Sequence, residues 1–154
     1  MKEITALIIA LEEKVPMLQH ENLKISKAKV GWHIQHSLMV INSIIDALKK
    51  SEQANYRWKF NLGRYYILFI NKIPRGKGKA PKVVQPKDAF TKELLIESVA
   101  LAKQNIHELR HLQKNHYFIH PYFGMLNLKP SIRFLQIHTQ HHLNIINDIL
   151  HVKK

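Results

Sequence analysis

The feature that most restricts the fold of this chain is a set of apolar stripes with helical periodicity, separated by short segments rich in proline and glycine. One stripe, with spacings of four, three, four and three residues, consists of Ile34, Leu38, Ile41, Ile45 and Leu48. A second stripe consists of Leu95, Val99, Ala102, Ile106 and Leu109. Residues with these spacings lie on one face of a helix, and such a face must pack against other apolar surface. No segment of useful length alternates apolar and polar residues as a half-buried strand would, so the pattern predicts an all-α fold.

The positions of the stripes and of the helix breakers predict five helices. Their approximate ranges are 4–14, 27–50, 55–73, from 88 or 91 to 114, and 130–151. Pro74 and Gly76 should end the third helix, and Pro130 suits the first turn of the fifth, where its missing N–H group would have no partner. Segment 74–87 should be an exposed loop, whereas segment 116–129, which mixes aromatic residues with turn formers, should pack against the protein.

The length and the helix pattern together predict one domain covering residues 1–154. Long helices joined by connections of medium length are typical of helix bundles. We expect a four-helix bundle with an additional short N-terminal helix.

Charge and cysteine content narrow the function classes. The chain has 24 Lys and Arg, 11 Asp and Glu, a net charge of +13 and no cysteine. A metal ion would therefore be held by nitrogen or oxygen ligands, and a disulfide framework is excluded. The charge is compatible with nucleic-acid binding, but most lysines are scattered and only segment 74–82 is a dense basic cluster. Nucleic-acid binding through that segment is thus an alternative that we do not favour.

The expected location is the cytoplasm. Residues 1–14 include acidic residues and predict an amphipathic helix that ends before Pro16, unlike a secretory signal. No uncharged segment reaches the length of a membrane span. We expect no membrane partner.

Histidines are the residues most indicative of chemistry. Three pairs have the four-residue spacing that places two side chains on one helix face, about 6 Å apart; they are His107 and His111, His116 and His120, and His138 and His142. The first pair lies off the apolar stripe of its helix and should be exposed, and the second spans a loop. His138 and His142 instead lie in the middle of an apolar stripe, together with residues such as Leu135 and Ile146.

Two imidazoles directed into a core need a polar partner, because an unpaired buried polar group is costly. The simpler interpretation, in which each ring bonds a backbone carbonyl, would serve for one isolated histidine. A pair on one face favours a shared metal ion, which then needs a third ligand from another helix. The helix at 27–50 offers His33 and His36, and helical geometry alone leaves both open.

Three motifs carry a resemblance to a known family. Segment 30–36, Val-Gly-Trp-His-Ile-Gln-His, resembles the ligand-bearing helix of the DinB-like superfamily of metalloenzymes, and segment 138–143, His-Thr-Gln-His-His-Leu, resembles its second ligand motif. Segment 120–124, His-Pro-Tyr-Phe-Gly, together with the basic loop, resembles one branch of that superfamily, whose members mostly have no assigned function. The resemblance covers residues 27–150, nearly the whole chain.

The resemblance implies an up-down-down-up four-helix bundle, often a homodimer, with a metal site formed by His36, His138 and His142. It places the third ligand at His36 rather than His33. Zinc or nickel is common in relatives, and some relatives are transferases or isomerases that use a low-molecular-weight thiol. This chain differs from many relatives in its strongly basic composition, which fits either an anionic substrate or a proteome that is basic in general.

Three neutral imidazoles leave a divalent ion with its full charge and an open position, an arrangement typical of catalytic sites. We therefore expect metal-dependent hydrolysis or thiol transfer on a small-molecule substrate. His33 and His120 are candidates for supporting the ligands or transferring protons, and loop packing explains His120 equally well. A non-catalytic bundle with a structural metal is the remaining alternative.

Overall fold

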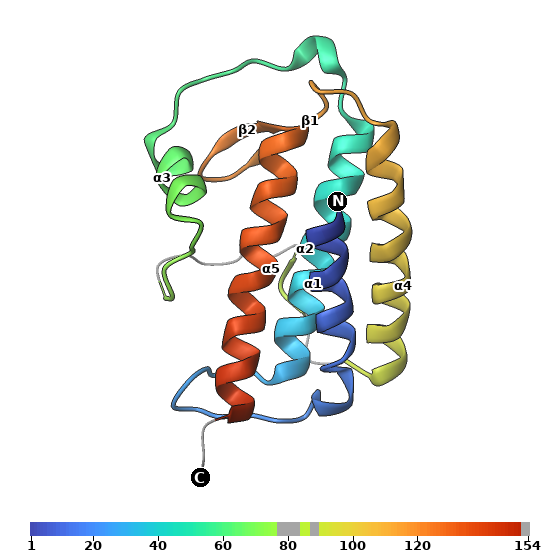
Figure 1. Cartoon of the computed structure of the whole chain (residues 1–154), viewed down its shortest axis with the longest axis vertical. Helices are drawn as coiled ribbons and strands as arrows, with labels where there is room; N and C mark the ends of the chain where they lie inside the picture. The colour runs from blue at the N-terminus through green and yellow to red at the C-terminus, as the bar shows by residue number, and fades with distance from the viewer. Residues whose placement is uncertain (77–83, 87–89, 152–154) are drawn as a thin grey trace.

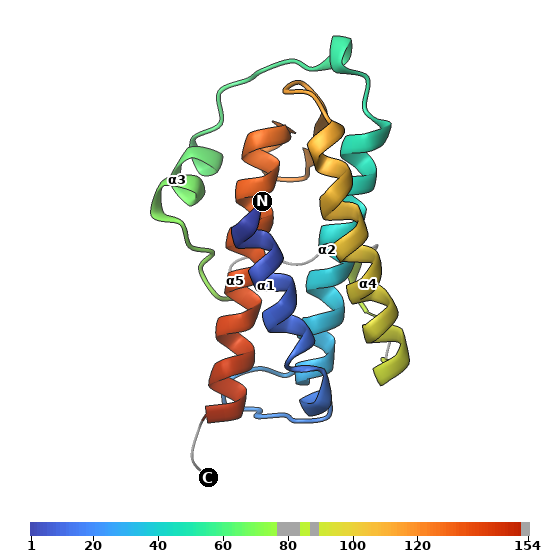
Figure 2. The same ribbon diagram turned by 45° about the vertical axis from the view of Figure 1, so that its right-hand side comes forward.

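The computed structural model describes residues 1–76, 84–86 and 90–151. Four helices pack side by side around an apolar core, and a short fifth helix lies outside them (Figures 1 and 2). The four are α1 (Lys2–Glu12), α2 (Val30–Lys50), α4 (Lys92–Glu108) and α5 (Leu128–His151), and the short one is α3 (Leu62–Ile70). The prediction of a mainly helical fold is confirmed.

The packing of the four helices puts α1 inside the bundle rather than beside it. Both α1 and α2 pack against α4 and α5, whereas α3 packs mainly against α5. Figures 1 and 2 show α1 and α5 running in one direction and α2 and α4 in the other. The additional helix is therefore α3, and not the N-terminal helix as the sequence suggested.

The core consists of the predicted stripes. All five residues of the α2 stripe are completely buried, from Ile34 to Leu48, and every residue of the α4 stripe from Leu95 to Leu109 is buried as well. Burial of such side chains contributes about 1.5–3 kcal/mol each relative to exposure. Within the described residues, no helix combines the length and the apolar composition needed to cross a bilayer.

The third helix is shorter than predicted at both ends. Asn61 begins it, because the Asn61 side chain accepts a hydrogen bond from the backbone N–H of Arg64 at 2.8 Å. Asn71 ends it by adopting a left-handed conformation, with φ of 55°. The predicted end at residue 73, before Pro74, is wrong because a left-handed asparagine stops the helix earlier. Most of segment 55–61 is not helical; only its first residue, Asn55, lies in a short 3-10 turn, Gln53–Asn55.

Segment 116–129 contains a β-hairpin that the sequence analysis missed. Strands β1 (Tyr117–His120) and β2 (Gly124–Asn127) pair antiparallel, with Phe118 opposite Leu126, and both of these residues are buried. Four-residue strands are too short for alternation to be visible in the sequence. The prediction that this segment packs against the protein is correct, but the expectation of a purely α-helical chain is corrected by this small sheet. The sheet lies at the end of the bundle where α5 begins (Figure 1).

Candidate metal centre

Packing of α2 against α5 brings three histidines together in the bundle. His36 of α2 and His138 and His142 of α5 each offer one ring nitrogen, and these three atoms lie within 4.8 Å of one another. In the part of the chain that the structure describes, this is the one group of three or more such side chains close enough to share a metal ion. The trio implied by the resemblance is therefore the trio that the fold brings together.

His36 is held by one backbone carbonyl and one aromatic ring. Its Nδ1 donates a hydrogen bond to the carbonyl oxygen of Val84 at 2.6 Å. Its ring stacks on Trp32, with centroids 4.9 Å apart and planes inclined by 19°. A proton fixed on Nδ1 leaves the lone pair of Nε2 free for a metal ion, the usual arrangement of histidine ligands.

His142 is supported by His33, which lies one turn before His36 on α2. The Nδ1 atoms of His33 and His142 are 3.0 Å apart, and Nε2 of His33 is 3.0 Å from the hydroxyl oxygen of Ser26. When His142 donates a hydrogen bond from Nδ1, His33 accepts it at its own Nδ1 and donates from Nε2 to Ser26. Both rings are then neutral, and both nitrogens of His33 have a partner. That tautomer leaves Nε2 of His142 free for a metal ion. His33 thus contacts a member of the trio rather than belonging to it.

His138 supplies the observation that a metal ion would explain. The side chain is half-buried, but its Nδ1 is buried and has no hydrogen-bond partner within the described residues. The ring packs beside Phe134 and faces the rings of His36 and His142 at centroid distances of 5.1 and 4.6 Å. A buried polar atom without a partner costs about 1–3 kcal/mol, and coordination through Nδ1 would remove that cost.

The three rings are neutral at physiological pH. Burial lowers the pKa of His138 and of His142 well below the ordinary value of 6.5, and the neighbouring imidazoles lower it further. Burial also lowers the pKa of His36, although the hydrogen bond to Val84 opposes this effect. Burial, followed by the charges of His36, His141 and Arg75, lowers the pKa of His33 to about 4. Only the neutral imidazole binds a metal ion, so these environments favour ligation.

The distances are compatible with a single ion after a small inward movement. A zinc–nitrogen bond is about 2.1 Å long, which puts tetrahedral ligand nitrogens about 3.4 Å apart. The observed spread of up to 4.8 Å needs ring displacements smaller than a bond length. Together with the unpartnered Nδ1 of His138, this geometry fits a divalent metal ion.

His120 lies in the hairpin and has a local structural role. Its Nδ1 accepts hydrogen bonds from the backbone N–H groups of Tyr122 and Phe123, at 3.1 and 3.2 Å, and its ring stacks on Phe123. Burial lowers its pKa to about 4. Phe134 contacts the rings of both His120 and His138. The turn geometry accounts for His120 as a packing residue, and its participation in proton transfer stays a prediction.

The other histidine pairs lie away from the trio. His107 and His111 are exposed on α4 and the turn that follows it, as predicted. His116 bonds the carbonyl oxygen of Leu48 through Nδ1, at 3.0 Å. Most of the basic segment 74–82 lies outside the described residues.

Three contributors to the site were missed from the sequence. The carbonyl of Val84 carries no side-chain signal, and Val84 lies in a segment without periodicity. Ser26 precedes α2 and matches no motif. Trp32 belongs to the motif that carries the resemblance, but its stacking on His36 was not predicted. Only the contact between His36 and Val84 joins segments distant in the chain, because Ser26 lies seven residues from His33 and Trp32 lies on the same helix as His36.

The support that His33 gives to His142 leads to a prediction. In His33→Phe, Nδ1 of His142 would lose its partner while all three ligand rings remain, so we expect metal affinity to fall about 10- to 100-fold with the stoichiometry unchanged. A competition titration with a chromophoric chelator measures the change. Ser26→Ala, which removes a partner one step further from the trio, should have a smaller effect. Equal affinities for His33→Phe and wild type would contradict this role of His33.

The fold and the site define a mainly helical protein with a three-histidine cluster in its interior that could hold a metal ion. No family model, curated protein or solved structure matches the chain. The cluster itself therefore carries the functional argument, and the DinB-like resemblance remains an expectation from the motifs.

Proposed function

We propose that this protein is a metal-dependent enzyme of the DinB-like superfamily that binds one divalent ion, zinc or nickel, through His36, His138 and His142. The observation that carries the proposal is the convergence of these rings within 4.8 Å, with a buried nitrogen of His138 left unpartnered. The proposed scaffold is an up-down-down-up bundle whose members are α1, α2, α4 and α5.

The site has the features of a catalytic centre rather than a closed structural one. Three protein ligands leave a tetrahedral ion one position short, and structural zinc sites usually have four. His138 is partly exposed, so the cluster is not sealed from solvent. A divalent ion held by three neutral imidazoles supplies Lewis acidity, which promotes ionisation of a water or a thiol in contact with it.

The residues around the trio have supporting functions in this proposal. Val84 and His33 fix the tautomers and orientations of His36 and His142. Trp32 covers one face of His36 and limits its movement. These contacts hold two of the three rings in place before an ion binds, which reduces the ordering cost of binding.

The proposed substrate is a small molecule that is anionic or a thiol. Arg75 forms an ion pair with Asp148 of α5 at 2.6 Å. Burial is the largest cause of the lowered pKa of His141, and the positive charge of Arg75 is the second, so Arg75 lies close to the site. His141 in turn packs edge-on against His142. This guanidinium is exposed, and an anionic group of the substrate would compete with Asp148 for it near the trio. The reaction classes that this chemistry supports are hydrolysis and thiol transfer.

The test uses protein purified without an affinity tag, because a histidine tag would bind metal itself. We expect about one zinc or nickel ion per chain by elemental analysis. A cobalt-loaded sample should then change its visible spectrum when a low-molecular-weight thiol is added, if the reaction is thiol transfer. Unchanged spectra with thiols, combined with turnover of activated esters or amides, would assign hydrolysis instead.

Two results would contradict the proposal. Protein that binds no divalent ion would remove the metal centre altogether. A bound ion whose cobalt spectrum responds to neither thiols nor small anions such as azide, and whose removal unfolds the chain, would identify a structural metal.

A further inference from the structure

Helix α3 differs from the other helices, because one stripe of its apolar residues faces solvent, while Ile67 and Leu68 on its other side are half-buried. Leu62, Tyr65, Tyr66 and Phe69 have helical spacings of three, one and three, which puts them within an arc of about 100°. They are 72%, 45%, 57% and 89% exposed. The one buried residue of α3 is Arg64, which lies on the opposite side of the helix. A stripe of this kind normally packs into a core.

Arg64 anchors the side of α3 opposite the exposed stripe and thereby holds the stripe outward. Its guanidinium donates to the carbonyl oxygen of Met125 in β2 at 3.1 Å and to that of Lys59 at 2.6 Å. The side chain of Asn61 donates to the carbonyl oxygen of Tyr122, at 3.0 Å. The helix is therefore attached to the β-hairpin, and its orientation is determined by specific hydrogen bonds.

The exposed apolar surface extends beyond the helix. The ring of Phe60, itself 67% exposed, stacks on Tyr65 with centroids 5.5 Å apart. We define the α3 face as Phe60, Leu62, Tyr65, Tyr66 and Phe69. Single exposed apolar residues are common, but a contiguous group of five indicates a binding surface.

The segment that contains this face is basic in sequence. Residues 53–76 include five Lys and Arg and no Asp or Glu. Arg57, Lys59 and Lys72 flank the face in sequence and are exposed. A partner should therefore offer negative charge together with an apolar layer.

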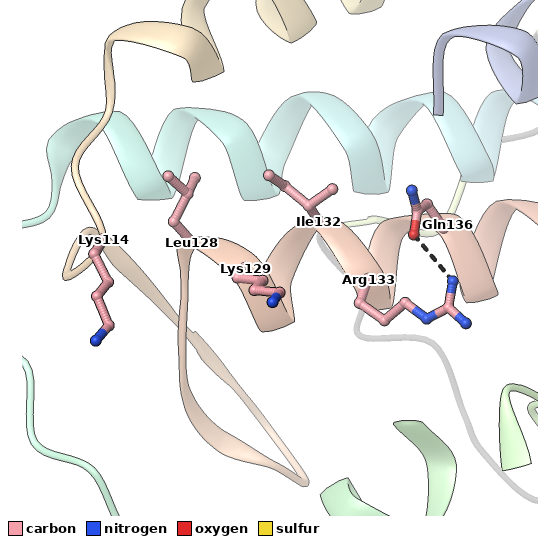
Figure 3. A pocket seen from close by; sticks show the side chains of 6 residues that line it. All are labelled: Lys114, Leu128, Lys129, Ile132, Arg133 and Gln136. Atoms are coloured by element: carbon pink, nitrogen blue, oxygen red, sulfur yellow. Dashed lines mark hydrogen bonds between the residues drawn. The ribbon is translucent and has the colours of Figure 1, made fainter. Parts of the chain in front are cut away.

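Three occupants are compatible with an apolar face, and the charges and shape separate them. A second copy of the chain would bring two acid-free basic stretches together, which charge repulsion opposes. A peptide is usually bound in a groove, and two cavities in the described part of the chain both lie away from the residues of the α3 face. The first, of about 520 Å³, lies on the start of α5 and is lined by Lys114, Leu128, Lys129, Ile132, Arg133 and Gln136 (Figure 3). The second lies between α1 and the end of α4.

We propose that the α3 face docks on the surface of an anionic lipid bilayer, with the aromatic rings at headgroup depth and the flanking basic residues on the lipid charges. Figures 1 and 2 show α3 on the outside of the four packed helices, and among them it packs mainly against α5. Aromatic side chains with polar tips suit the membrane interface, and each basic residue near an anionic surface strengthens binding about fivefold. This peripheral contact replaces the sequence-based expectation of no membrane partner and does not depend on the metal site.

Sedimentation with lipid vesicles tests the proposal on the full chain. At low salt we expect binding to vesicles of phosphatidylcholine mixed with phosphatidylglycerol, an anionic lipid, and none to phosphatidylcholine alone. The double variant Tyr66→Ser with Phe69→Ser should lower the partition coefficient at least tenfold. Because both side chains are exposed, the helical circular dichroism should be unchanged. Lys59→Gln with Lys72→Gln should weaken binding to anionic vesicles and reduce its salt dependence.

Leu23→Ser is the matched control, because Leu23 is 74% exposed outside the α3 face and should not affect binding. The fluorescence emission of the variant Phe69→Trp, combined with Trp58→Phe, should shift to shorter wavelengths when anionic vesicles are added. Absence of sedimentation at low salt, or sedimentation that the double variant leaves unchanged, would overturn the proposal. So would a dimer of the wild-type chain in light scattering that the same double variant dissociates, since the face would then belong to a second copy.

Discussion

The variant His142→Ala is expected to lose metal binding almost completely. His142 packs beside both His36 and His138, with ring centroids 4.7 and 4.6 Å away, and its removal leaves two ligands on different helices. Structural zinc sites with four ligands bind with roughly 10–16 kcal/mol, or about 2.5–4 kcal/mol per ligand. Losing one ligand should therefore weaken binding by roughly a hundred- to a thousandfold. Elemental analysis after dialysis measures the loss as a fall from about one ion per chain to nearly none.

The control for this variant is His107→Ala. His107 is exposed on α4 and lies outside the cluster, so its loss should leave the metal content unchanged. His142→Ala protein that retains one ion per chain would contradict the assignment of the site. If His36→Ala and His138→Ala also retained one ion per chain, the three histidines would not form a metal centre.

The variant His138→Phe is expected to be more stable than wild type when both are free of metal, and to gain nothing from added metal. Phenylalanine has a similar shape and would remove the buried Nδ1 that has no partner among the described residues. It would also extend the packing against Phe134. The cost relieved is about 1–3 kcal/mol. Chemical denaturation with and without a chelator measures both effects.

Wild-type protein should show the opposite response to metal. A free ion at about 100 times its dissociation constant stabilises the folded state by about 2.7 kcal/mol. For a chain of this length, that corresponds to a rise in Tm of roughly 5–11 °C. If metal-free His138→Phe protein were less stable than metal-free wild type, Nδ1 of His138 would not destabilise the fold. A Tm of this variant that still rises with zinc would place the binding site elsewhere.

The two predictions separate ligation from packing. His142 and His138 lie on one face of α5, yet their Nδ1 atoms differ in environment, because His142 is bonded to His33 and His138 has no such partner. An alanine scan alone would record metal loss at both positions. The stability of the metal-free variants distinguishes them, since only His138 carries a polar cost that an apolar ring would remove.

Helical periodicity was sufficient to predict α2, α4 and α5 and the burial of their apolar stripes. The same periodicity placed His138 and His142 inward, because two positions four residues apart share the direction of the surrounding apolar residues. It failed for α3, where the apolar positions predict a buried helix and the structure shows them exposed. Burial of Arg64 on two carbonyl groups decided that orientation, and these carbonyls belong to Lys59 and Met125.

The two histidines of α2, His33 and His36, also show where helical periodicity is insufficient and tertiary contacts decide. Both histidines lie on the inward side of α2 and both are buried, so their sequence environment does not separate them. In the fold, His36 faces the pair on α5 and is fixed by Val84, whereas His33 is placed between His142 and Ser26. Segments 48 and 109 residues apart meet at these bonds, and local pattern contains no information about such distant contacts.

The sequence by itself determined that the chain is helical, which faces of its main helices are buried, and that two histidines point into the interior. Periodicity left the third histidine open, the motif resemblance implied His36, and the fold brings His36 to the pair. Only the tertiary structure decided which rings support the trio and that α3 turns its aromatic face to solvent. The physical reason is that periodicity reports the direction of a side chain relative to its own helix. Convergence on one point depends instead on how separate helices pack, and that is set by contacts between residues far apart in the chain.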